Sequence, residues 1–315
     1  MRILLAALSL IVLICSAAAA PAELEGTIDA HFASVNALGV NPVDGILYSA
    51  GKDGRVRIWD PDSLEMILEV QACLTGVNDI AVSNDGSLVA TAGNDGFIQV
   101  WDALTAELEL AFPAHDGPVN TLAFDVNDEF LYSGGDDGFV RSWEVEGEDD
   151  IFVLNWEAFT HVNGVNDLLV NSEAEYMFSG GADGKIAFFD TLAGRLENTV
   201  QAFENAEVLC LSFAKGEACL AAGATNGEFR AWDAATGTQI CEVRAHAGNV
   251  NTIYSANGLV VTGGEDGHIR MWNDHGQMVG DLQAHVLGVN AFTVSDDTIF
   301  TGGSDYKVRV WGANF

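Results

Sequence analysis

The chain contains 315 residues, of which 49% are hydrophobic, and this is enough apolar material for the core of one all-β domain. Its 46 acidic and 13 basic residues give a formal net charge of −33 at pH 7. Such a surface excludes nucleic acid and anionic lipid as partners, because both need Lys and Arg to neutralise their phosphates, and it suits a cationic partner or divalent ions.

Residues 1–22 are predicted to be a secretory signal peptide. Arg2 gives a short positive region, Ile3 to Ile14 is an apolar run too short to span a bilayer comfortably, and Ala20-Pro21-Ala22 has the form of a cleavage site. The mature protein would begin near Glu23, would be secreted or periplasmic, and would have no membrane attachment. The alternative is an uncleaved N-terminal segment that anchors it to a membrane.

One unit repeats through residues 23–315. A ten-residue motif that begins Gly-x-Asp-Gly or similar ends in an aromatic residue followed by an acidic one, as in Gly51 to Asp60. The aromatic positions recur every 39 to 46 residues, at Trp59, Trp101, Trp143, Phe189, Trp232, Trp272 and Trp311. A valine precedes each of them by 24 residues in the first five copies and by 22 in the last two, at Val35, Val77, Val119, Val165, Val208, Val250 and Val289. A period of this length is typical of propellers and other repeat folds.

Each copy is predicted to form four short strands. In the second copy, Asn84-Asp85-Gly86 and Asn94-Asp95-Gly96 are tight-turn signals that separate runs of β-branched and apolar residues. The four runs are Val77–Val82, Leu88–Thr91, Phe97–Trp101 and Leu108–Phe112. Four antiparallel strands every 40 or so residues form one blade of a β-propeller.

The chain resembles the WD40-repeat family over essentially the whole of residues 23–315. The naming dipeptide is present at Trp59-Asp60, Trp101-Asp102 and Trp232-Asp233, and Ala-His stands where the family usually has Gly-His, at His31, His115, His246 and His285. The resemblance implies an all-β, seven-bladed propeller with four antiparallel strands per blade. It also implies a scaffold for protein–protein interaction rather than an enzyme.

The ring is predicted to be closed by the N-terminal strand. Only four residues follow Trp311, whereas every other copy has about ten further residues for its outer strand. Leu24 to His31 matches the outer strands of other copies, such as Gln277 to His285. Residues 24–30 should therefore pair with residues 307–311, because an open ring would expose the edges of its sheets.

Sets of Asp, His and Ser or Thr invite a hydrolase interpretation. They recur as Asp53/His31/Ser49, Asp137/His115/Ser133, Asp266/His246/Thr262 and Asp305/His285/Thr301, and one active site does not need four copies. In the family that the chain resembles, these groups join the tryptophan in a buried hydrogen-bond network that braces each blade. No P-loop, nucleophile elbow, dinucleotide fingerprint or transition-metal spacing is present, so we predict no catalytic residue, no metal site and no cofactor.

Three copies depart from this pattern. Cys73 replaces histidine in the second and Phe189 replaces tryptophan in the fourth. The fifth has Glu204, Ala222 and Asn226 where His, Ser and Asp would stand, so it should be the least braced.

The fifth copy also holds Cys210, Cys219 and Cys241. Cys210 and Cys219 fall on paired strands of one predicted hairpin, but not opposite each other. A structural disulfide and a role as small apolar filler both remain open for them.

The resemblance places the usual partner surface on the face with the loop before the first strand and the turn between the second and third strands. The residue after the marker valine is Asn in six copies. The predicted partner-binding residues are Asn36, Asn78, Asn120, Asn166, Asn251 and Asn290, with the turn residues Lys52, Asn94, Asp136 and Glu265. These asparagines either form a polar funnel for a ligand or satisfy backbone groups at the strand starts.

Trp156 lies outside the repeat pattern and follows an acidic insertion, Glu144 to Asp150, that should project from the opposite face. An exposed Trp there could be a second contact site, or it could pack on the outer strand.

The sequence thus predicts a secreted or periplasmic, monomeric scaffold that binds a protein partner. The alternative is a propeller that binds a small ligand, a sugar or an ion through the asparagine funnel.

Overall fold

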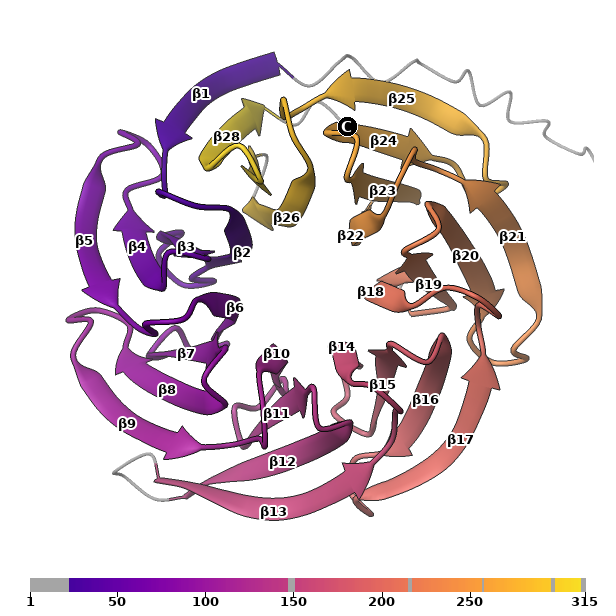
Figure 1. Ribbon diagram of the computed structural model, residues 1–315, viewed down its shortest axis with the longest axis horizontal. Coiled ribbons are helices and arrows are strands. Elements are labelled where there is room, and N and C mark those ends of the chain that lie inside the picture. The colour runs from indigo at the N-terminus through magenta and orange to yellow at the C-terminus, as the bar shows by residue number, and fades with distance from the viewer. Residues whose placement is uncertain (1–22, 147–150, 215–216, 257, 296–297, 313–315) are drawn as a thin grey trace, which may run out of the picture.

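The structure is a computed structural model that describes residues 23–146, 151–214, 217–256, 258–295 and 298–312. The regular elements within these ranges are 28 β-strands. They form seven four-stranded antiparallel sheets, which surround a central opening as the blades of a propeller (Figure 1). The predicted fold class is confirmed.

In blades one to six the strands run in sequence order from the central channel to the rim. Blades one to three comprise β2 (Val35–Val40), β3 (Leu47–Gly51), β4 (Arg55–Trp59) and β5 (Met66–Gln71); β6 (Val77–Val82), β7 (Leu88–Gly93), β8 (Phe97–Asp102) and β9 (Leu108–Pro113); and β10 (Val119–Phe124), β11 (Phe130–Gly135), β12 (Phe139–Glu146) and β13 (Ile151–Phe159). Blades four to six comprise β14 (Val165–Val170), β15 (Tyr176–Gly181), β16 (Lys185–Asp190) and β17 (Arg195–Gln201); β18 (Val208–Ala214), β19 (Cys219–Ala224), β20 (Glu228–Asp233) and β21 (Gln239–Arg244); and β22 (Val250–Ala256), β23 (Leu259–Gly264), β24 (His268–Trp272) and β25 (Met278–Gln283).

Blade seven contains both ends of the described chain. It is built from β26 (Val289–Ser295), β27 (Thr298–Gly303), β28 (Lys307–Gly312) and the N-terminal strand β1 (Glu23–Asp29). β1 pairs antiparallel with β28, from Glu23 opposite Gly312 to Asp29 opposite Lys307, and it buries Ile28. The predicted closure by the N-terminal strand is confirmed.

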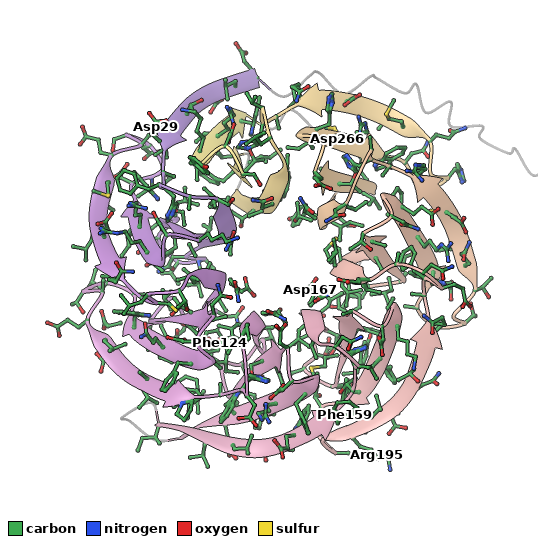
Figure 2. All side chains as sticks on the ribbon, viewed as in Figure 1. Asp29, Phe124, Phe159, Asp167, Arg195 and Asp266 are labelled. Atoms are coloured by element: carbon green, nitrogen blue, oxygen red, sulfur yellow. The ribbon has the colours of Figure 1, made fainter. Side chains whose placement is uncertain are left out.

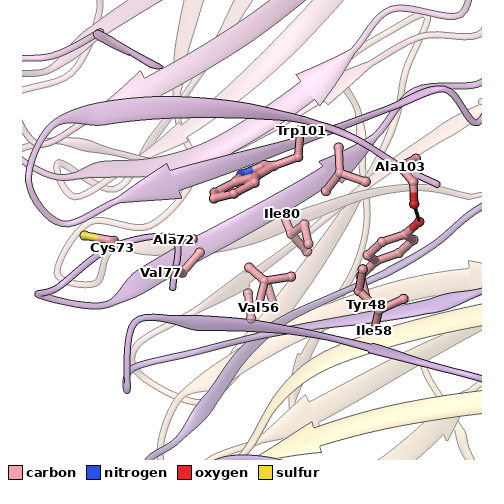
Figure 3. Close-up of a cluster of buried hydrophobic side chains, with 12 residues drawn as sticks. Tyr48, Val56, Ile58, Ala72, Cys73, Val77, Ile80, Trp101 and Ala103 are labelled. Atoms are coloured by element: carbon pink, nitrogen blue, oxygen red, sulfur yellow. Dashed lines mark hydrogen bonds between the residues drawn. The ribbon is translucent and has the colours of Figure 1, made fainter. Parts of the chain in front are cut away.

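Burial follows the position of each strand in its blade. All five residues of β3 are buried, because both faces of that strand lie against neighbouring blades, whereas β9 on the rim alternates between exposed and half-buried residues. The apolar core consists of clusters packed between blades. Figure 3 shows the one between blades one and two, where the Tyr48 hydroxyl donates a hydrogen bond of 2.9 Å to the carbonyl of Ala103.

Trp156, on β13, packs against its neighbours. Its ring stacks on Phe189 with centroids 5.9 Å apart and lies 6.0 Å from Tyr132, so it fills space beside the position where blade four has Phe in place of Trp. The packing interpretation of Trp156 is therefore favoured over a contact site. Residues 147–150 of the acidic insertion lie outside the described residues, as do residues 1–22 of the predicted signal peptide.

The cysteines of blade five favour the filler interpretation. Cys210 and Cys219 are both buried thiols that belong to the apolar cluster between blades five and six. Burial raises the pKa of the Cys210 thiol, and the nearby charge of Asp167 adds to this, so Cys210 is an inert, neutral group.

Candidate functional site

A buried hydrogen-bonded group, here named the brace, holds the loop before the first strand in five of the blades. In blade one, His31 Nδ1 lies 2.9 Å from Asp53 Oδ1, His31 Nε2 lies 2.8 Å from Ser49 Oγ, and Trp59 Nε1 donates to Ser49 Oγ at 2.9 Å. The same His–Asp and His–Ser/Thr contacts join His115/Asp137/Ser133, His161/Asp183/Ser179, His246/Asp266/Thr262 and His285/Asp305/Thr301. These repeated, buried sets brace the fold, as the sequence predicts.

The protonation states in the brace suit a structural role. Burial lowers the pKa of His31, against the opposing effect of Asp53, so the imidazole is neutral at pH 7. Burial alone would raise the pKa of Asp53, but hydrogen bonds from the Phe32 N–H, from His31 and from Arg57 outweigh it and lower the pKa to about 2. Nδ1–H of the histidine then donates to the carboxylate, and Nε2 accepts from the hydroxyl.

Blade five lacks this brace, and one prediction for it is wrong. Phe203, not Glu204, occupies the place of the histidine. The backbone N–H groups of Ala202 and Phe203 donate to the carbonyl of Gly184, as those of Ala114 and His115 donate to the carbonyl of Gly96. The loop is one residue longer than in the other blades, and this moves Glu204 to the surface. Phe203 is buried, meets the Trp232 ring edge-on at 6.4 Å, and lies beneath the Arg230 guanidinium at 4.7 Å.

A glycine-to-alanine difference accompanies that change. In the braced blades a glycine lies against the imidazole, and a Cβ on Gly51 or Gly181 would approach it to within 2.3 Å. Blade five has Ala224 at the equivalent place, opposite the marker Val208. Ala224 and the missing histidine are therefore two parts of one departure from the pattern.

The predicted asparagines occupy β-bulges at the wall of the central channel. In each blade the register between the first two strands shifts directly after the marker valine, as between Val35 and Ala37, so the residue between them is the extra residue of a bulge. That residue is Asn36, Asn78, Asn120, Asn166, Leu209, Asn251 or Asn290. All seven line one cavity of about 290 Å³.

Each of the six asparagines donates a hydrogen bond from Nδ2 to the backbone carbonyl of the marker valine in the next blade. The distances are 2.8 to 2.9 Å, and Asn290 completes the circle by donating to Val35. Asn78 and Asn120 also donate to Asn94 and Asp136 of their own turns. The bonds join Asn36 to Val77, Asn78 to Val119, Asn120 to Val165, Asn166 to Val208, Asn251 to Val289 and Asn290 to Val35.

This asparagine ring favours the structural interpretation over the ligand funnel. One N–H of each side-chain amide is already bonded to a backbone carbonyl of the next blade and is not available to a ligand. The structure thus brings eight of the ten predicted residues together, the six asparagines with Asn94 and Asp136. Lys52 and Glu265 are exposed on the same face, where Glu265 accepts from the Asn249 N–H.

Two aspartates follow the asparagines in the channel wall. Asp79 accepts from the backbone N–H of Leu122 and Asp167 from that of Leu211, each in the next blade, and Thr121 lies 3.5 Å from Asp167 (Figure 2 labels Asp167 beside the channel). Burial raises the pKa of Asp79 to about 6. Burial and the charge of Asp79 raise the pKa of Asp167 to about 7, against the hydrogen bond from Leu211.

Sequence reasoning missed a set of exposed apolar side chains on the face that carries the loops before the first strands, here named the His-loop face. Most of them lie on three consecutive blades around the ring, seven, one and two, and Val162 of blade four is 54% exposed at the same loop position. Phe32 is 80% exposed, Leu74 is 89% exposed and Val286 is 80% exposed, and each directly follows the histidine position of its blade. Leu287 and Tyr306 of blade seven are also exposed. The signal in the sequence that could have identified them was an apolar residue directly after the histidine position, in a loop that needs only polar residues.

The described residues contain no cluster of three or more His, Cys, Asp or Glu side chains arranged to hold a metal ion. No helix among them has the length and apolarity needed to cross a bilayer.

The comparison with protein families identifies the chain. The model of the family described as WD domain, G-beta repeat matches residues 22–60, 66–102, 106–144, 155–190, 237–273 and 276–312, which together are more than half of the chain. The protein therefore belongs to the WD40-repeat family, whose propellers generally serve as scaffolds for protein interaction. The six matches leave out residues 191–236, where blade five departs from the bracing pattern. A search of curated proteins finds no match to the chain.

Proposed function

We propose that this protein is an exported, non-catalytic scaffold that binds a protein partner through the His-loop face. The observation that carries the proposal is the set of exposed apolar side chains on blades seven, one and two. Contiguous exposed apolar groups are costly in water, and on soluble proteins they commonly mark interaction surfaces. Phe32, Leu74, Val286, Leu287 and Tyr306 supply the aromatic and aliphatic anchors that such a surface needs.

Two of the loops that carry these anchors are held in place in the free protein. In blade one the N–H of Phe32 donates to Asp53, and in blade seven the N–H of Val286 donates to Asp305, so the brace fixes the backbone beside these two anchors. A preformed surface loses less conformational entropy on binding than a flexible one. The braces, which a hydrolase interpretation would make catalytic, thereby serve binding indirectly.

The acidic charge of the protein indicates which residues a binding partner would carry. The rest of the His-loop face carries exposed acidic residues, including Asp116, Asp136, Glu204 and Glu265, within a chain of net charge −33. A complementary partner would present apolar side chains flanked by Lys and Arg, and its association would be faster at low salt than at high salt.

A matched pair of double variants tests the face. Leu74→Asp/Val286→Asp places two charges on the His-loop face. Leu104→Asp/Leu192→Asp does the same in the turns between third and fourth strands, at the opposite end of the blades, where the two leucines are 86% and 81% exposed. A protein cross-linked from the native extracellular fraction and identified by mass spectrometry should bind the wild type and the control alike. Its Kd should rise at least tenfold with the first variant, and equal binding by both variants would refute the proposed face.

The export of the protein is part of this proposal. It is supported by Arg2, the apolar run of residues 3–14 and the small residues up to Ala22. Mass spectrometry of the native protein should find an N-terminus near Glu23. A native protein that retains residues 1–22 would contradict cleavage and favour the membrane-anchored alternative.

A further inference from the structure

An apolar pocket lies between blades four and five, away from the His-loop face anchors and from the channel. Its volume is about 100 Å³. The walls come mainly from β15, β16 and β17 of blade four and from β19 and β20 of blade five. They include Phe178, Ile186, Phe188, Val200, Leu220 and Trp232.

The same place between blades one and two provides an internal comparison. The equivalent residues there are Tyr48, Val56, Ile58, Val89 and Trp101, with Val70 in the place of Val200, and they leave a void of only about 10 Å³. The residues at the junction of blades four and five are not smaller overall. Three differences do remove volume: Phe178 lacks one hydroxyl relative to Tyr48, Asn198 stands in place of Leu68, and Gly237 stands in place of Ala106. However, Ile186, Phe188 and Leu220 exceed their counterparts.

Two hydrogen bonds that secure the junction of blades one and two have no counterpart at the pocket. Trp101 is anchored by its bond of 3.2 Å to Thr91, and Tyr48 ties blade one to the buried Ala103. At the other junction neither tie can form, because Ala222 offers no hydroxyl to Trp232 and Phe178 has none to donate. Trp232 is only half-buried, and Ala234, the counterpart of Ala103, is exposed.

We propose that this pocket is a binding site for a small, uncharged, apolar molecule with a single aromatic ring or a branched aliphatic group. An enclosed apolar cavity of about 150 Å³ accommodates benzene. This pocket of about 100 Å³ is open to solvent beside the half-exposed Val200, so a ring can enter it while one edge of the ring stays exposed. The described lining carries one formal charge, that of Asp233, and it offers no cation to an anionic ligand. The pocket thus selects for an uncharged ring that contacts Phe188 and Trp232.

Toluene is a suitable probe, with benzoate as its anionic counterpart. Titration of the full chain should shift the indole N–H resonance of Trp232, assigned by its absence in Trp232→Phe, with saturation at one site and a Kd of about 0.1–1 mM. The melting temperature should rise with toluene concentration, since a ligand that binds only the folded state stabilises it. Benzoate should produce neither effect.

A matched pair of filling variants locates the site. Val200 is half-exposed on β17, so Val200→Phe should close the pocket without disturbing the fold and should weaken toluene binding at least tenfold. Val70→Phe makes the same change at the equivalent place in blade one and should leave binding unchanged. Failure of toluene to saturate the Trp232 resonance, or equal binding by Val200→Phe and the wild type, would overturn the proposal.

Discussion

The structural role of the asparagine ring can be tested by replacing every second asparagine around it with leucine. The triple variant Asn36→Leu/Asn120→Leu/Asn251→Leu removes the bonds of 2.8 to 2.9 Å that these residues donate to the next blade. Leucine is already present in the same bulge at position 209, so it is sterically compatible with that backbone. The substitution therefore isolates the hydrogen bonds from the shape of the bulge.

The expected loss follows from the carbonyl groups left behind. Each replacement leaves the carbonyl of Val77, Val165 or Val289 without its side-chain donor, and such a loss costs roughly 1–2 kcal/mol at a half-buried site. The three sites lie at separate blade junctions, so their effects should add to roughly 3–6 kcal/mol. For a domain of this size, that corresponds to a fall in Tm of about 6–12 °C.

Urea and thermal denaturation followed by circular dichroism measure this loss, with Leu209→Ala as the control, because Leu209 donates no hydrogen bond from its side chain. The control should cost less than any single Asn→Leu change. A triple variant as stable as the wild type would refute the structural interpretation of the ring. Loss of partner binding at unchanged stability would restore the ligand-funnel interpretation.

Three further predictions concern stability. Removal of residues 23–29 takes away β1 and should lower the Tm by more than 10 °C in a thermal melt, because it exposes the edge of β28 and the apolar surface that Ile28 covers. An unchanged Tm would disprove closure of the ring by β1. Ser133→Ala leaves His115 and Trp143 without their shared hydroxyl and should cost about 2–4 kcal/mol in urea denaturation, with a loss below 0.5 kcal/mol counting against the brace. Burial, the larger cause, and the charge of Asp79 raise the pKa of Asp167 to about 7, above its ordinary 3.8. The contribution of Asp167 to the stability of the fold is therefore complete below about pH 4 and is lost as the pH rises through 7. Asp167→Asn should therefore gain stability relative to the wild type between pH 5 and 8.5, by at most about 4 kcal/mol, and a difference that does not change with pH would contradict the raised pKa.

The sequence by itself determined the fold. The valine and aromatic positions recur at fixed distances, and each repeat carries its own turn signals, so the number of blades and strands follows from local patterns alone. The brace residues were predictable for the same reason, since His31, Ser49 and Asp53 keep their spacing in other copies. The short C-terminal copy and the strand-like residues after position 23 likewise predicted closure of the ring.

Only the tertiary structure decided what these residues contact. The bond from Asn36 reaches a carbonyl 41 residues away, and the bond from Asn290 to Val35 spans 255 residues, so no local pattern distinguishes them from ligand-binding amides. The assignment of Phe203 rather than Glu204 depended on where a one-residue insertion is accommodated, which is set by backbone bonds to Gly184. The exposure of Phe32 and Leu74 and the pocket between blades four and five depend on how whole blades pack. Such packing sums contacts between segments far apart in the chain, and a repeat pattern specifies each blade but not the space between two of them.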